Sequence, residues 1–214
     1  MKGNIVALLL GISCLAATLV KAQGFDKKDI SVCFYDVTIS SELGIIPDRT
    51  IDDSIYNAIT KILKDSADIN LNSIDYLKDK IPYIFGYPVG TARKAAKSKM
   101  SHSYVKIIVD IQPAGVFSTS SSSSMVGAGI GSEKKKIKAR VKVAINLEIY
   151  NDNGDKVKDV VAKVSSKNKI EIDTKSLEIG SFSIMNLDKN DDNFDSFQDL
   201  ISAAAIKIVN ELKQ

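Results

Sequence analysis

The sequence predicts an α+β fold, a single antiparallel or mixed sheet with a long central hairpin and helices packed on it. The first observation is a period of two between Ile137 and Val164, where apolar and polar residues alternate on both sides of a turn. The second is a pair of amphipathic stretches, 51–64 and 195–212, whose apolar residues recur every three or four positions. Half-buried strands and one-sided helices cover each other's apolar surfaces, so both observations indicate one shared core.

The first 22 residues have the composition of a secretory signal peptide. Lys2 supplies a positive start, residues 5–19 are apolar or small, and Val20-Lys21-Ala22 has small or apolar residues where signal peptidase cuts. We therefore expect cleavage after Ala22 and an exported chain, periplasmic or secreted, that begins at Gln23. The apolar run is short for a membrane span and no later segment is longer, so we expect no transmembrane segment in the mature chain. A retained N-terminal anchor is the alternative.

The two cysteines suggest neither a lipid anchor nor a disulfide. Gly11 stands where a lipobox has Leu or Val, so we expect no lipid on Cys14. Cleavage would leave Cys33 alone, which excludes an intramolecular disulfide. Cys33 lies in an apolar, strand-like run, and the sole histidine, His102, precedes a different strand. We interpret Cys33 as a small buried hydrophobe rather than a nucleophile.

Residues 23–214 are expected to form one domain with the elements in the following order. Strands are predicted at 30–37, 68–72, 104–112, 137–150, 157–164 and 169–173, and helical segments at 51–64, 73–80, 91–100 and 195–212. The run 30–37 is apolar on both faces, as in an interior strand. Thr50 and Asp53 have the spacing of a capping box. Asn151 to Asp155 tolerates positive φ and predicts the hairpin turn. The Ser/Gly-rich segment 118–132 is interpreted as a mobile loop.

The strongest charge feature is a basic ribbon of Lys136, Lys138, Arg140 and Lys142, which the strand period places on one solvent face. Such a ribbon is a candidate polyanion-binding site, or simply a charged face that keeps a strand soluble. We expect no nucleic acid, because the chain is predicted to be exported and no aromatic residues interleave with these cations. The net charge of +3 falls to +1 when the leader is removed and favours no class of partner.

A metal site is only weakly indicated. Asp188, Asn190 and Asp192, with Asp199, match the spacing of a calcium loop, but Asn193 replaces the glycine at its sixth place. We favour an acidic helix cap for this segment. A single histidine argues against a zinc hydrolase, and we expect no cofactor. A hydrolase that relies on carboxylates alone remains open.

The order of the elements resembles a known family. A leader precedes a strand and a capped helix, then come the strand from Tyr104, a Gly/Ser insertion, the long 138–150 strand turning at Asn153-Gly154, and an alanine-rich closing helix. This order is similar to the periplasmic α/β domain shared by the curli-secretion lipoprotein CsgG and the penicillin-binding-protein activator LpoB, over roughly 29–212. The chain departs from that pattern in lacking a lipobox, and no functional residue is carried over.

These observations lead us to expect a non-catalytic cell-envelope binding or assembly module, whose partner is another envelope protein. An exported carboxylate-dependent hydrolase and a polyanion-binding surface protein are the alternatives.

Overall fold

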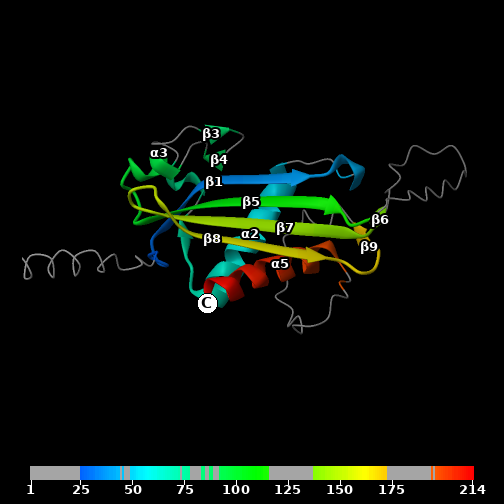
Figure 1. The fold of residues 1–214 in the computed structure, drawn as a ribbon. Helices are drawn as coiled ribbons and strands as arrows, with labels where there is room; N and C mark the ends of the chain where they lie inside the picture. Colours follow the sequence, from blue (N-terminus) through cyan, green and yellow to red (C-terminus); the bar gives the residue numbers. More distant parts are fainter. Residues whose placement is uncertain are drawn as a thin grey trace, which may run out of the picture.

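The computed structural model describes residues 25–43, 45, 49–72, 74–77, 83–84, 87–88, 92–115, 137–172, 194 and 196–214. Its centre is a five-stranded mixed sheet in the order β2-β1-β5-β7-β8 (Figure 1). The strands are β1 (Ile30–Ile39), β2 (Leu71–Asn72), β5 (Ser103–Pro113), β7 (Val141–Asn151) and β8 (Lys156–Ser165). β1 runs parallel to β2 and β5, whereas β7 is antiparallel to β5 and β8. The predicted α+β class and its single main sheet are confirmed, and the sheet is of the mixed type.

Two long helices cover one face of this sheet. α2 (Arg49–Ala67) and α5 (Phe197–Leu212) pack against each other on the same side of the strands (Figure 1). Alternate residues of β7 meet them and are buried, as the period of two predicted; these are Val141, Val143, Ile145, Leu147 and Ile149. The apolar residues that recur along both helices are buried as well, so the sheet and the helices share one core.

The opposite face carries a smaller layer at the β1 edge. It consists of η2 (Ile74–Leu77), β3 (Tyr83–Ile84), β4 (Tyr87–Pro88) and α3 (Ala92–Ala96). η2, β4 and α3 contact β1, and β3 pairs with β4; Figure 1 shows α3, β3 and β4 beside β1. A second apolar cluster forms beneath this layer; its buried members are Cys33, Leu77, Ala92, Ala95, Ala96 and Tyr104. The first half of β1 is therefore covered on both sides. The prediction of two covered faces for all of 30–37 is wrong in its second part, because Asp36 is exposed.

The predicted hairpin forms, with one correction at its beginning. β7 and β8 pair antiparallel, with a register shift between Ile149 and Tyr150, but the predicted strand 137–150 is interrupted at Arg140. The Arg140 carbonyl accepts from the Ala114 N–H at 2.8 Å, and the Val141 N–H donates to the Ser166 hydroxyl at 2.9 Å. β6 (Ile137–Ala139) instead pairs with β9 (Ile170–Ile172). The periodicity survives this break, which is why the sequence pattern does not reveal it.

The turn of the hairpin has the conformation that its residues predict. The Asn151 side-chain oxygen accepts from the N–H groups of Asn153 and Asp155, at 3.0 and 2.9 Å. Gly154 adopts φ +80°, a region that glycine enters without a steric penalty. The turn is thus stabilised by the side chain of its first residue, Asn151. Its glycine, Gly154, has no side chain and can approach another element closely.

The helix ends differ from expectation in one case. α2 begins at Arg49, so Thr50 lies inside the helix and is not its N-cap. α5 has a complete capping box, in which Ser196 and Asp199 each satisfy the other's backbone N–H. η1 (Ser41–Leu43) completes the described elements. Within the described ranges, no helix combines the length and apolarity needed to cross a membrane.

Candidate binding site

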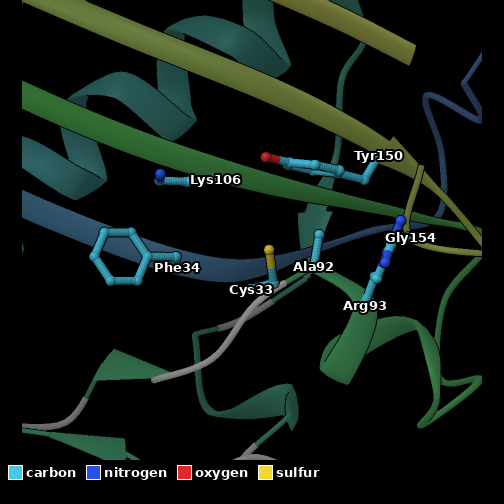
Figure 2. A pocket seen from close by; sticks show the side chains of 7 residues that line it. All are labelled: Cys33, Phe34, Ala92, Arg93, Lys106, Tyr150 and Gly154. Carbon is cyan, nitrogen blue, oxygen red and sulfur yellow. The ribbon is translucent and has the colours of Figure 1, made fainter. Parts of the chain in front are cut away.

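A pocket of about 350 Å³ opens on the face of the sheet opposite α2 and α5. It lies where β1, β5, the β7–β8 hairpin and α3 meet, and its lining residues are Cys33, Phe34, Ala92, Arg93, Lys106, Tyr150 and Gly154. Figure 2 shows Phe34 and Lys106 at one end, Arg93 and Gly154 at the other, and Cys33 with Ala92 between them. The pocket therefore has an apolar middle and a cationic side chain at each end.

A β-bulge in β1 creates the floor of this pocket. Val32 pairs with Val105 and Phe34 pairs with Lys106, so Cys33 is an extra residue without a partner on β5. The extra residue lets Val32 and Tyr35 both contact the helix-covered core while Phe34 remains on the opposite face. Cys33 itself joins the second apolar cluster.

A row of charged residues crosses the sheet from the pocket. Lys106 pairs with Glu148 across β5 and β7, and Glu148 pairs with Asp159 across β7 and β8. The Glu148 carboxylate has the ammonium groups of Lys106 and Lys156 at 3.6 Å each, and Lys156 also reaches Asp159 at 2.8 Å. Because Lys156 bridges both acids, Glu148 and Asp159 do not form the open carboxylate pair that a glycosidase requires.

Two further contacts fix the side chains at the Lys106 end. The Lys106 ammonium lies 5.4 Å from the centroid of the Phe34 ring, within cation–π range. The Tyr150 hydroxyl donates to the Glu148 carboxylate. Burial, followed by this hydrogen bond and the charge of Glu148, raises the pKa of the Tyr150 phenol well above its ordinary value. Tyr150 therefore stays protonated and serves as a hydrogen-bond donor and an aromatic wall.

The other end of the pocket depends on close contact between the hairpin turn and α3. A Cβ atom placed on Gly154 would lie 2.7 Å from the Cα and 2.9 Å from the backbone nitrogen of Arg93. Only glycine permits this approach, since both neighbouring atoms belong to the backbone. The contact fixes the position of α3 against the hairpin and presents the exposed Arg93 side chain at the pocket.

Cys33 is buried, as predicted, with 1% of its surface exposed. Burial raises the pKa of its thiol from 9.0 to about 12. The thiolate is the nucleophilic form, so Cys33 is unreactive at neutral pH.

The single histidine belongs to a different group of polar residues. The His102 Nδ1 and Asp29 Oδ2 atoms are 2.7 Å apart, and Asn72 donates to Asp29, Ser31 and Ser101. Desolvation raises the pKa of Asp29, but hydrogen bonds from His102, Asn72 and Ser101 outweigh it and hold that pKa below its ordinary value. The Ser31 and Ser101 hydroxyls hydrogen-bond to each other, and both accept from Asn72. A serine hydrolase instead needs a serine hydroxyl that is hydrogen-bonded to the histidine ring. We interpret this group as a clamp on the ends of β1, β2 and β5.

The described residues of the predicted basic ribbon are not among those that line the pocket. Lys138 and Arg140 are exposed, Lys142 is half-buried opposite Gln112 and Ser165, and Lys136 is outside the described residues. The three described cations occupy the start of the hairpin, whereas Tyr150 lies near the end of β7. The alternation of burial continues through the break at Arg140, since Ala139 and Val141 on either side of it are buried.

The metal candidates Asp188, Asn190 and Asp192 lie outside the described residues, as does the predicted loop 118–132. Asp199 caps α5, in line with the helix-cap interpretation. Over the part of the chain that the structure describes, no three His, Cys, Asp or Glu residues are grouped to hold a metal ion.

Comparison with known proteins gives a fold-level similarity at most. No protein-family model matches the sequence, and no curated protein matches it. Among solved structures, the chain is similar to the hypothetical protein CT253 from Chlamydia trachomatis, with a TM-score of 0.38 and 8% sequence identity. That match covers 88% of this chain and 94% of the other. It assigns neither a family nor a function, so the resemblance to the CsgG and LpoB domain stays a prediction.

Proposed function

We propose that this protein is an exported, non-catalytic binding module of the cell envelope, and that the pocket between α3 and the sheet holds part of its partner. The observation that carries the proposal is that the acidic group beside the pocket is already held in ion pairs and a hydrogen bond, and that the pocket thiol is protonated. Glu148 is engaged by Lys106, Lys156 and Tyr150, and the Cys33 thiol has a pKa of about 12. Catalysis needs a group that exchanges a proton or attacks near neutral pH, so this arrangement favours binding over chemistry.

Export is supported by the leader-like composition of residues 1–22. If the leader is cleaved after Ala22 and Cys14 is not lipidated, protein isolated from its native host begins at Gln23 and carries no lipid. Intact-mass measurement of that protein tests both points. An N-terminal Cys14 with attached acyl chains would refute the unlipidated form, and a full-length chain in the cytoplasmic fraction would refute export.

Binding at the pocket is tested by site-specific photo-crosslinking in intact cells. A photoreactive residue replaces Asn153, which is exposed in the turn beside Gly154, and in a matched control it replaces Lys61, which is exposed on α2. We expect a discrete crosslinked species from position 153 that position 61 does not give, because α2 lies on the other side of the sheet. The absence of a species at position 153, or the same species at both positions, would contradict the proposal.

A second candidate function is polyanion binding through the predicted basic ribbon. The observation that favours it is that Lys138 and Arg140 are exposed and that they alternate with the buried residues Ala139 and Val141. Exposed cations of this kind attract anionic surfaces in a salt-dependent manner. Its test is separate from that of the pocket, because the two sites share no residue.

A further inference from the structure

The middle of the pocket suits an apolar group. Cys33 and Ala92 are buried beneath it, and the rings of Phe34 and Tyr150 form its walls (Figure 2). Its volume of about 350 Å³ is near the lower limit of small-molecule sites, which span roughly 300–1,000 Å³. This is the space of about twelve water molecules in the liquid. An occupant that displaces this water gains by burying an apolar body of similar size.

The two cations at the ends of the pocket are not equivalent. Lys106 already has Glu148 at 3.6 Å and the Phe34 ring beneath it. The Arg93 guanidinium, by contrast, makes no ion pair with any described residue, although it lies beside the turn that carries the exposed Asp152. The positive charge left unmatched at the pocket is therefore that of Arg93.

A guanidinium has a definite preference among anions. Its planar fork matches a carboxylate with two parallel hydrogen bonds, and such charge-assisted bonds are stronger than those between neutral groups. The contact between Gly154 and the Arg93 backbone fixes the base of this side chain, which lowers the entropic cost of holding the head group over the pocket.

We propose that the pocket binds a carboxylate with a compact apolar body, the acid on Arg93 and the body over Cys33 and Ala92 between the two rings. This inference rests on the proposed function and specifies the chemistry that the binding module recognises. Two sources share that chemistry, a free apolar acid and the C-terminal carboxylate of a protein that ends in an apolar residue.

The ligand side of the test uses pairs that differ in one property. Phenylpropionate is compared with phenylpropanol, which lacks the charge, and with acetate, which lacks the apolar body. The amide signals of Ala92, Cys33 and Gly154 are followed by NMR titration. We expect the acid to bind at least about tenfold more tightly than the alcohol, as for a hydrogen bond between charged groups. A short peptide ending in phenylalanine, with a free or an amidated C-terminus, tests the protein source in the same way.

The protein side of the test removes the charge of Arg93 or reverses its sign. Arg93→Ala should weaken phenylpropionate binding by about tenfold or more, whereas Lys97→Ala, an equal charge loss outside the pocket, should leave it unchanged. Arg93→Glu should prefer phenylpropylamine to phenylpropionate, a gain that misfolding cannot imitate.

The inference would be overturned if acid and alcohol bind equally, if no member of the panel shifts the pocket signals, or if Arg93→Ala and Lys97→Ala behave alike. Crosslinking from position 153 despite such a result would leave the binding module standing and refute only the ligand class. Binding of either the free acid or the free-ended peptide supports the inference and identifies the source.

Discussion

Gly154→Ala should destabilise the protein by about 2–5 kcal/mol. A Cβ atom at φ +80° costs about 1–2 kcal/mol because it meets the following carbonyl oxygen. The same atom would lie 2.7 Å from the Arg93 Cα, and overpacking of this kind costs about 1–3 kcal/mol. No change of side-chain rotamer relieves the contact, since the opposing atoms are backbone, so either the turn or α3 must move.

Two measurements on the chain from Gln23 onward separate these responses. Urea unfolding followed by far-UV circular dichroism gives the loss of stability, with Asp152→Ala in the same turn as a control expected to stay within about 0.5 kcal/mol. The labelling rate of Cys33, which is buried next to α3, reports whether α3 moves away. If Gly154→Ala is as stable as the control and labels no faster, the close approach of the turn to α3 is wrong.

Three further predictions concern burial, pH and surface charge. Val143→Asp places a charge in the core and should lower the free energy of unfolding in urea by about 4 kcal/mol or more. Lys142→Asp, on the opposite face of β7, should lower it by about 0.5 kcal/mol or less. The reverse order would mean that the strand register is shifted by one residue. The lowered pKa of Asp29 means that the stability it contributes is present above its ordinary value of 3.8 and is lost as the pH falls through the folded value. The stability deficit of Asp29→Asn should therefore be constant above about pH 5 and shrink as the pH falls further, and a deficit that stays constant at low pH would contradict this sign. Reversing all four cations of the ribbon, Lys136, Lys138, Arg140 and Lys142, should abolish salt-sensitive binding to heparin while circular dichroism is unchanged. A parent protein that does not bind heparin at low salt would remove polyanion binding as a candidate.

Local patterns in the sequence predicted the elements because each pattern reports one exposed and one buried side. The alternation in β7 gave the faces of Val143 and Lys142, and the helical spacing gave the inward residues of α5. The same alternation concealed the break at Arg140, because an interruption that preserves the period leaves no trace in it. The Thr50 cap failed because capping residues also occur within a first turn.

The pocket was beyond sequence reasoning for a different reason. It brings Phe34, Lys106 and Tyr150 together through strand pairings between residues far apart in the chain, and pattern alone does not specify partner strands. The bulge at Cys33 is hard to see because the residues from Val32 to Tyr35 are all apolar or aromatic, so none of them marks a face. Its one trace in the sequence is that the polar residues on either side, Ser31 and Asp36, fall on opposite phases of the alternation. The sequence predicted Gly154 as a residue of the turn, but not its close contact with Arg93 of α3.

The bulge gives a last prediction, which compares two single-residue deletions in β1. Removing Cys33 joins Val32 directly to Phe34, and their partners Val105 and Lys106 are already consecutive on β5. The deletion therefore leaves every other residue on its present face and sacrifices only the buried thiol. Removing Asp36, an exposed residue three positions on, shifts the rest of the strand by one and exchanges its buried and exposed faces.

On surface exposure alone, deleting Asp36 would be the milder change, whereas a bulge at Cys33 predicts the opposite order. We expect the protein without Cys33 to fold with a loss of about 1–3 kcal/mol, comparable to removing one small buried side chain, and the protein without Asp36 to lose cooperative unfolding. Thermal unfolding by circular dichroism ranks the two. If the protein without Asp36 is the more stable, Cys33 is an ordinary paired residue of β1, and the pocket floor is not the product of a bulge.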